Sequence, residues 1–519
     1  MLVALHEATM GRPFEEIIVD EYNNIYPKQA QDVYLTVCLL NRLGTQVRAG
    51  LIARVHDIVF NDFEEKLFAP LEHIVQVKGK ADRRDFYYTS RHPQIAQIVF
   101  EEVLTEDADR YNEYIRVIKH LNISYDTDRE SFRKLVNAKS LENIFVSPED
   151  IRAIFDIAKE CVGEDAYLYQ QMANYERINP DGNHQLAEEY LKLAQEIDPR
   201  DSSIVHSQAE LAVTRARQAQ RPLERQKFRN QALLIVEGLI DKPQSDRHAR
   251  GTYLKLAIDD LKYILEQQDP IDRDIEEAIR AIEKILETTK QKYPEDSFVN
   301  NSEADFGIII NDNKRVLKAL ENAFKNNYRD PYITMRLANF YKSKNQLESA
   351  KSCLQKALNS LTLNKELNYE YAQILSMIDS SNIESLIYYY KKAFSKGDQN
   401  YYAQFWYARY LFESNDLEKI NESKKIFSNL RKAPIQYEIR IKILDYIKDN
   451  SANKLFLGRV HRLEAEHGFV VVDGRGDNIF FHRNNVGDKT WNSLKAGSRI
   501  SFNIGFTFSG PVAIKVQIS

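Results

Sequence analysis

The stretch LANFYKSKNQLESAKSCLQKALNS, residues 337–360, decides the fold of most of this chain. Small residues recur in it at Ala338, Ala350 and Ala357, and larger ones stand at Tyr341 and Leu354. That spacing predicts two helices joined by a turn. Ala338 and Ala350 allow the two helices to approach closely, because their side chains are small. Tyr341 and Leu354 are expected to fill the space between the helices.

The same spacing resembles the tetratricopeptide repeat, a helix–turn–helix unit of about 34 residues. The resemblance implies an α–α superhelix over residues 166–450, whose concave face binds a peptide, a partner domain or a nucleic acid. The aromatic residues of the repeats are expected to pack between helices, and prolines mark helix breaks. A looser earlier copy of the repeat contains Ala187, Leu191, Ala194, Val205, Ala209 and Ala212, and a later one contains Trp406, Ala408, Leu411 and Phe427. The helix breaks are expected at Pro180, Pro199 and Pro331.

Composition separates the end of the chain from the rest. The 519 residues carry a net charge of −5, with 43% hydrophobic and 28% charged residues and only 18 glycines, which favours a mainly helical globular protein. Residues 454–519 hold nine Lys and Arg against five Asp and Glu, a net charge of +4. The first 453 residues therefore carry −9. Positive charge is concentrated in the last segment, where attraction to polyanions is expected.

Residues 454–519 also contain five short β-runs separated by turns. The runs are LFLGRVHRLEA, HGFVVVDG, DNIFFHR, SRISFNIGFT and PVAIKVQI. Five short strands within 66 residues predict a small closed barrel of the OB type. The predicted fold class is thus mainly α, with a small C-terminal five-stranded β-barrel.

Strand periodicity predicts a flat surface on this barrel. Phe469 and Val471 point to one side of their strand, as do Phe480 and His482 on the next. If the two strands are neighbours, these side chains form a platform on which the bases of a single strand stack, at ~1–3 kcal/mol per base. The surrounding basic residues supply attraction for phosphates.

The segment resembles a cold-shock domain. HGFVVV (467–472) stands where that family has its first RNA-binding motif, and NIFFH (478–482) stands where it has the second. The resemblance covers nearly all of 456–518 and implies binding of single-stranded RNA or DNA. Three of the family's stacking aromatics are replaced, by Arg462, Val471 and Arg483.

Arginine stacks as a planar cation and pairs with phosphate, so the replacements shift binding towards electrostatics. The predicted nucleic-acid-binding residues are Phe469, Phe480, His482, Arg462, Arg483, His461 and Val471. The alternative is a barrel that serves as a protein contact or a structural cap.

Residues 1–105 follow a winged-helix order of helices, a hairpin and a helix, and residues 106–165 read as a helical connector. A winged helix does not by itself establish DNA binding, and the segment expected to enter a groove carries only Arg48 and Arg54. The polar tip of the predicted hairpin lies at KGKADRR, residues 78–84.

This N-terminal part resembles the end of a STAND-type signalling NTPase. LHEATMGRPFEEII (5–18) is similar to the tail of the family's helical lid, and FYYTSRHPQIAQIVFEEVL (86–104) is similar to its last winged-helix strand and helix. The resemblance implies that His92, within Arg91-His92-Pro93, senses bound nucleotide. It also implies either a catalytic core upstream of this sequence or a split or degenerate relative of the family. In relatives with an upstream core, that core is expected to carry an effector, often one of anti-phage defence.

No enzyme is expected within the chain itself. It lacks Gly-x-x-x-x-Gly-Lys-Ser/Thr, so nothing cradles phosphates, and it lacks His-Glu-x-x-His and Gly-x-Ser-x-Gly. We therefore expect no catalytic residue, no cofactor and no metal. Three scattered cysteines, the lack of a long apolar run and the lack of a signal peptide predict a cytoplasmic protein without a membrane partner.

Three hypotheses remain open from the sequence. The first is the regulatory and sensor portion of a STAND-like NTPase, the second a stand-alone RNA-binding adaptor, and the third a scaffold that binds only proteins. The sequence directly upstream would separate the first from the others, because an in-frame P-loop decides it.

Overall fold

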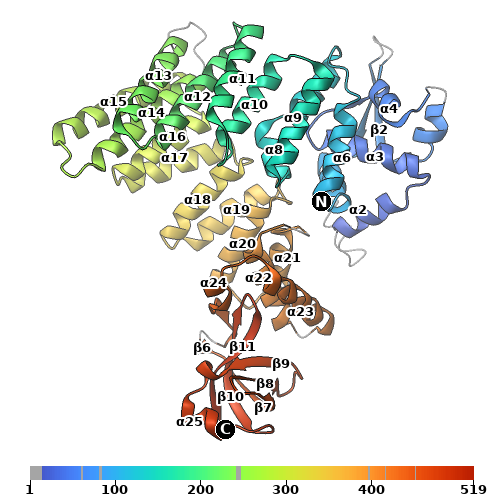
Figure 1. The fold of residues 1–519 in the computed structure, drawn as a ribbon, viewed down its shortest axis with the longest axis vertical. Coiled ribbons are helices and arrows are strands. Elements are labelled where there is room, and N and C mark those ends of the chain that lie inside the picture. The colour runs from blue at the N-terminus through green and yellow to red at the C-terminus, as the bar shows by residue number, and fades with distance from the viewer. Residues whose placement is uncertain are drawn as a thin grey trace. The chain divides into compact units, whose positions relative to one another are not determined.

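The computed structural model forms two compact units, Met1–Asp312 and Asn313–Ser519. Figure 1 shows the helices and strands of both units. The described residues are 14–59, 62–80, 85–240, 247–395, 398–414, 416–449 and 452–519.

The first unit begins with helices around a small sheet. The helix α3 is almost entirely buried, and it contacts the sheet and α5. The order helices, hairpin, helix is present as predicted, whereas the hairpin tip 81–84 and residues 5–13 of the lid-like stretch lie outside the described residues. The winged-helix assignment itself remains a prediction. The helices are α2 (Phe14–Asn23), α3 (Lys28–Asn41), α4 (Ala49–His56), the π-helix η2 (Glu64–Phe68) and α5 (Pro93–Val103), and the antiparallel sheet has the order β1 (Val47–Arg48), β3 (Asp85–Ser90), β2 (Val75–Lys80).

Four helices follow, where the sequence predicts a helical connector. Hydrogen bonds secure several of their ends. Arg110 Nε donates to Leu104 O at 2.7 Å, and Ser147 Oγ accepts from Asp150 N at 3.1 Å at the start of α9. The helices are α6 (Asp107–Ile118), α7 (Asp126–Leu135), α8 (Ala138–Ile144) and α9 (Pro148–Val162).

The rest of the first unit consists of successive helices that pack as hairpins. Each helix contacts the next, and α10, α12, α14 and α16 also contact one another in series. The predicted packing residues Ala187, Leu191 and Ala194 are buried. The helices are α10 (Ala166–Ile178), α11 (His184–Ile197), α12 (Ser202–Gln218), α13 (Pro222–Ile240), α14 (Arg247–Leu265), α15 (Asp272–Lys292) and α16 (Ser297–Ile309).

The second unit continues with helices of the same kind. Ala338, Ala350, Leu354 and Ala357 are buried, which confirms the helical hairpin predicted from residues 337–360. The helices are α17 (Asn313–Asn326), α18 (Pro331–Ser343), α19 (Leu347–Leu358), α20 (Lys365–Ile378), α21 (Ile383–Lys392), α22 (Tyr401–Glu413), α23 (Leu417–Lys432) and α24 (Tyr437–Ile441).

Tyr341 also has a contact outside its own hairpin. Its side chain is only half-buried, and its hydroxyl donates to Glu321 Oε1 of α17 at 2.7 Å. A phenol keeps a polar partner when it is partly buried, so the hydroxyl bonds to the preceding helix while the residue also lines a groove with Cys353 of its own hairpin.

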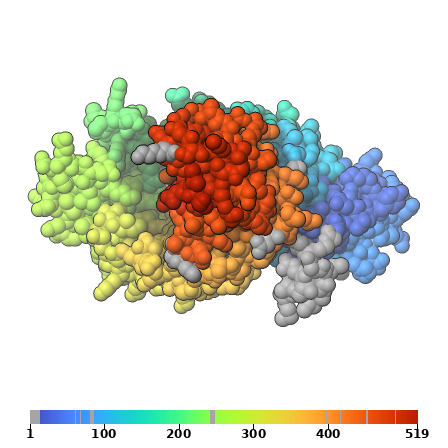
Figure 2. Space-filling model, turned by 90° about the horizontal axis from the view of Figure 1, so that it is seen from below, coloured from blue at the N-terminus to red at the C-terminus, as the bar shows by residue number. Residues whose placement is uncertain are grey.

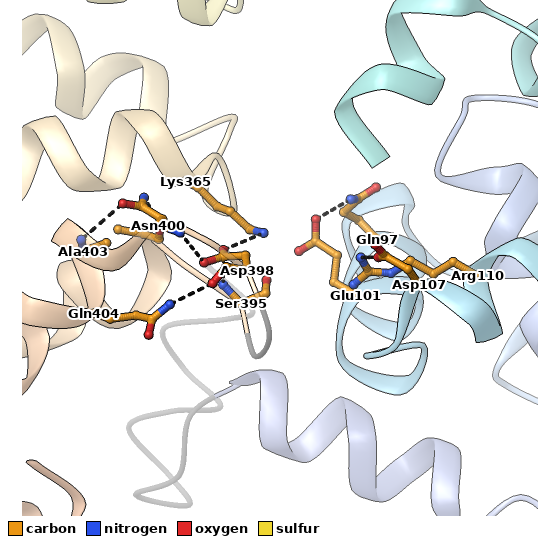
Figure 3. Close-up of polar contacts among 11 residues, drawn as sticks. Gln97, Glu101, Asp107, Arg110, Lys365, Ser395, Asp398, Asn400, Ala403 and Gln404 are labelled. Carbon is orange, nitrogen blue, oxygen red and sulfur yellow. Dashed lines mark hydrogen bonds and ion pairs between the residues drawn. The ribbon is translucent and has the colours of Figure 1, made fainter. Parts of the chain in front are cut away.

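Polar side chains bond to one another at helix ends and along helices, as Figure 3 shows for two regions. Before α22, Asp398 accepts from Ser395 N at 2.8 Å and from Asn400 N at 3.0 Å, and Lys365 Nζ lies 3.3 Å from its carboxylate. The Asn400 side chain then caps α22 by accepting from Ala403 N at 3.2 Å. In the first unit, Gln97 Nε2 donates to Glu101 Oε1 at 2.6 Å within α5.

The C-terminal segment forms a closed barrel of five strands, as predicted. Strand β7 pairs with β8, β8 with β9, β9 with β11 in parallel, β11 with β10, and β10 with β7. A further strand, β4, pairs with β10, although it lies within the range predicted for the repeats. The bounds are β4 (Asp445–Tyr446), β5 (Lys448–Asp449), β6 (Ala452–Asn453), β7 (Leu455–Leu463), β8 (His467–Val472), β9 (Asn478–His482), η3 (Arg483–Asn485), α25 (Asp488–Ser493), β10 (Arg499–Thr507) and β11 (Gly510–Ile518).

The barrel shares one core with the last helical hairpin. Phe506 of β10 lies with its ring centroid 5.5 Å from Phe412 of α22, and Phe508 lies 5.3 Å from Phe405. Arg409 of α22 is buried, and its Nε lies 2.7 Å from Asp445 Oδ2, while its Nη1 contacts Glu413. Burial alone would lower the pKa of Arg409, but the two carboxylates outweigh it and raise that pKa.

Candidate nucleic-acid interface

Burial alternates along the two strands that carry the predicted platform. In β8, Val470 and Val472 are buried, whereas Phe469 and Val471 are partly exposed. In β9, Phe481 is buried and its neighbour Phe480 is 37% exposed. The strands are antiparallel neighbours, so the outward residues of both form one surface, as the period of two predicts. The barrel is the red part of the space-filling view in Figure 2.

Three rings meet on this surface. Phe469 and Phe480 are direct cross-strand partners with ring centroids 5.8 Å apart at an edge-to-face angle of 70°. His467 stacks on Phe480 at 5.6 Å and 29°, and it meets Phe469 edge-on at 5.8 Å. We call His467, Phe469 and Phe480, together with His482 opposite His467, the aromatic cluster.

The other predicted residues border this cluster. Arg462 of β7 lies directly across from Phe469, and His461 occupies the bulge beside it and is exposed. Val471 lies one alternate position along β8 from Phe469. His482 is held by a local bond, because its Nδ1 accepts from Asn484 N at 3.1 Å. All seven predicted residues thus lie in the same part of the barrel.

The two arginines among the predicted residues have acidic neighbours. Arg462 Nε lies 2.5 Å from Glu464 Oε1, with both side chains exposed. Arg483 lies 3.3 Å from Glu466 and 3.5 Å from Asp488. Exposed ion pairs contribute ~0–1 kcal/mol, so an approaching phosphate competes easily with these carboxylates.

Two residues of this surface were missed by the sequence-based reasoning. His467 stands two residues before Phe469, and the same alternation that selects Phe469 would have selected it. Arg459 lies across from Val471 and is exposed. The alternation along β7 breaks at His461, which hides the fact that Arg459 and Arg462 border the same surface.

The predicted nucleotide sensor lies in the first unit. His92 is the N-cap of α5, and its exposed side chain accepts from Gln94 N at 3.2 Å through Nδ1. Its neighbour Arg91 forms an ion pair with Glu21. This is the local hydrogen bond of a helix-start histidine, and the sensor role remains a prediction.

The arginines considered for DNA contact serve the fold. Arg54 Nη2 lies 2.7 Å from Asp128 Oδ2, and Arg48 Nε lies 3.5 Å from Asp128 Oδ1. Asp128 is 1% exposed, so these two cations neutralise a buried carboxylate. Arg48 also lies over the ring of Tyr125 at 3.4 Å.

A groove lies among α17, α18 and α19. This groove of about 450 Å³ is lined by apolar and polar side chains, including Phe324, Leu337, Tyr341 and Cys353. Burial raises the pKa of Cys353 to about 12, so its thiol stays protonated and unreactive near neutral pH.

Two kinds of feature are absent from the described ranges. No group of three His, Cys, Asp or Glu side chains there is arranged to hold a metal ion. Among those same residues, none of the helices combines the length and the apolar character that a membrane span requires.

Comparison with known proteins gives structural neighbours only. No protein-family model matches the chain, and no curated protein matches it. Solved structures that align with it include the human IFIT1 dimer with m7Gppp-AAAA (12% identity, 65% of this chain, 73% of that chain, TM-score 0.34) and yeast Tom70 (13%, 64%, 85%, 0.23). A tetratricopeptide-repeat protein of Thermus thermophilus also aligns (16%, 40%, 98%, 0.30). The helical hairpins of the chain itself carry the fold assignment.

Proposed function

We propose that this protein binds single-stranded nucleic acid through the aromatic cluster of its barrel, as an adaptor whose helical hairpins hold the barrel and contact a protein partner. The observation that carries the proposal is the pair Phe469 and Phe480, which lie side by side on one partly exposed face. Phenylalanine on a strand is normally buried, and its exposure beside a second ring and an arginine is typical of a base-stacking surface.

The chemistry of the surrounding residues favours the same ligand. Each base that stacks on a phenyl or imidazole ring gains ~1–3 kcal/mol, whatever its identity, because every base has a π-face. Arg462 and Arg483 add cations at the edge of the cluster. We therefore expect weak preference among bases and a strong dependence of affinity on salt.

The helical hairpins support the adaptor part of the proposal. Stacked hairpins offer an extended surface, and the groove among α17, α18 and α19 provides apolar and polar contacts of the kind a bound peptide uses.

A regulatory role within a STAND-like NTPase, with His92 as nucleotide sensor, is a further proposal from the resemblance. Joining this chain to an upstream P-loop core and comparing ADP affinity of wild type and His92→Ala would test it.

The test of nucleic-acid binding uses the whole chain. A fragment starting at residue 454 would lose β4 and expose Phe506 and Phe508, which pack on α22. Fluorescence anisotropy with labelled ten-nucleotide RNA and DNA at low salt measures the affinity. Replacing Phe469 and Phe480 together by alanine should weaken binding at least tenfold, since each lost stack costs ~1–3 kcal/mol.

The matched control is Tyr332→Ala, which removes an exposed ring from α18 in the same unit. It should leave the affinity unchanged. If the wild-type chain retains no oligonucleotide at low salt, or if the double alanine variant binds as well as wild type, the proposed function is wrong.

A further inference from the structure

A pair of arginines lies beside the aromatic cluster, on the side away from Phe480. Arg459 of β7 and Arg499 of β10 are direct cross-strand partners, and both are exposed. Arg459 is also the cross-strand partner of Val471, which follows Phe469 by two residues along β8 and faces the same side. We call Arg459 and Arg499 the arginine pair.

The arginine pair brings like charges together. In an antiparallel sheet the Cα atoms of direct partners lie about 5 Å apart, and like charges in that position destabilise the sheet. Arg499 Nη2 lies 3.0 Å from Asp473 Oδ2, an exposed ion pair that offsets one of the two charges. Within the described part of the chain, no carboxylate lies within ion-pair distance of Arg459. The two positive charges of the arginine pair are therefore offset by only one carboxylate, that of Asp473.

The geometry places this unbalanced charge next to the stacking surface. Along β8, Val471 and Phe469 are two residues apart, which is about 7 Å on an extended strand. Arg459 is the cross-strand partner of Val471, and Arg462 is the cross-strand partner of Phe469. A single strand whose base lies on Phe469 would therefore have sugar and phosphate groups within reach of the long arginine side chains.

We propose that Arg459 and Arg499 bind backbone phosphates of the same single strand whose bases stack on the aromatic cluster, so that the site extends across β7 to β10. This inference rests on the proposed function and deepens it by assigning the phosphate contacts. Guanidinium groups suit the role, because each donates two parallel hydrogen bonds to a phosphate.

The experiment compares salt dependence instead of affinity alone. For single strands, the slope of log K against log salt is about −0.7 for each phosphate that the protein neutralises. In the whole chain, Arg459→Gln with Arg499→Gln should make the slope shallower by about 1.4 with a labelled ten-nucleotide oligonucleotide. Phe469→Ala with Phe480→Ala should weaken binding and leave the slope nearly unchanged.

The charge-matched control is Lys495→Gln with Lys515→Gln. Both lysines are exposed on the barrel and lie outside β7, β8 and β9. This variant has the same net charge as the arginine variant and should keep the wild-type slope. Circular dichroism melting of each variant verifies that the barrel is folded.

Two results overturn the inference while the proposed function stands. One is an unchanged slope in the arginine variant when the phenylalanine variant has lost affinity. The other uses poly-glutamate as a model of an acidic protein partner. If the arginine variant keeps its affinity for the oligonucleotide but loses binding to poly-glutamate, the arginine pair binds an acidic protein instead. A wild-type chain that binds no oligonucleotide removes both the inference and the proposed function.

Discussion

Two pairs of phenylalanines, one where the barrel meets α22 and one on the outer face of the barrel, have similar ring spacings and opposite surroundings. Phe506 and Phe412 lie 5.5 Å apart where β10 meets α22, and both are almost fully buried. Phe469 and Phe480 lie 5.8 Å apart on the outer face of β8 and β9, and both are partly exposed. Ring contact alone therefore does not distinguish a core from a binding surface. The difference is that the core shared by the barrel, α22 and α23 surrounds Phe506 and Phe412, whereas water reaches Phe469 and Phe480.

The arginines repeat the contrast. Arg409 is 4% exposed and lies between two carboxylates, Glu413 and Asp445. Arg459 is exposed and forms no ion pair among the described residues. A buried cation needs partners for the fold to form, whereas an exposed cation without a partner is available to a ligand. If burial separates these two roles, substitutions at covered and at exposed positions should differ in their effect on stability.

The largest expected effect is at the covered end of the barrel. Phe506→Ala should lower the free energy of unfolding by ~3–5 kcal/mol, because it leaves a cavity in the core shared with α22 and α23. Urea denaturation followed by circular dichroism measures the change. A loss below about 1 kcal/mol would mean that the barrel and the helices do not share a core.

The buried arginine ranks second. Arg409→Met removes the cation and leaves two acidic groups that are 17% and 21% exposed. We expect a loss of ~2–3 kcal/mol, somewhat below the 3–5 kcal/mol typical of a fully buried broken pair, since water still reaches these carboxylates. Arg459→Met is the matched control and should change stability by less than ~0.5 kcal/mol. Equal losses in the two variants would contradict the contrast between the arginines.

Local patterns allowed much of this structure to be predicted. The spacing of Ala338, Ala350 and Leu354 predicted a helical hairpin, because close packing of two adjacent helices depends on nearby residues. The five strands and the shared face of Phe469 and Phe480 followed from a period of two. All of these features depend on neighbours in sequence.

Contacts between distant segments were not predictable in this way. Phe405 and Phe508 meet across about one hundred residues, and the carboxylate of Asp445 reaches Arg409 from beyond α23. No local pattern shows that the last hairpin covers one end of the barrel. The hydrogen bond from Tyr341 to Glu321 on the preceding helix was unpredictable for the same reason.

The contrast extends to histidines, with a smaller effect. His56 is partly buried, and its Nε2 lies 2.9 Å from Thr36 Oγ1. Burial, with help from Arg116 and His120, lowers the pKa of His56 from 6.5 to about 3. His56 therefore binds a proton below pH ~6.5 in the unfolded chain, but only below about pH 3 in the folded chain. Stability falls as the pH falls through this window, by ~1 kcal/mol between pH 7.5 and 5.5.

Replacing His56 by Gln should remove that part of the pH dependence. Denaturation at several pH values measures it, and the exposed His461→Gln serves as the control. If both variants keep the wild-type profile of stability against pH, a different group controls it.

The smallest expected change in stability is at the outer face. Phe480→Ala removes a ring that is 37% exposed and that touches Phe469 and His467 without a cover above them. More than a third of the residue stays exposed to water in the folded chain, so we expect a loss of only ~1 kcal/mol in the same urea experiment, well below that of Phe506→Ala. Phe506→Ala differs from it only in the position of the deleted ring, and comparing the two isolates the effect of the cover. A loss above about 2 kcal/mol for Phe480→Ala would make the aromatic cluster part of the core, and its exposure would no longer point to a ligand. A small loss together with weakened oligonucleotide binding would show that these rings contribute to recognition and hardly to folding.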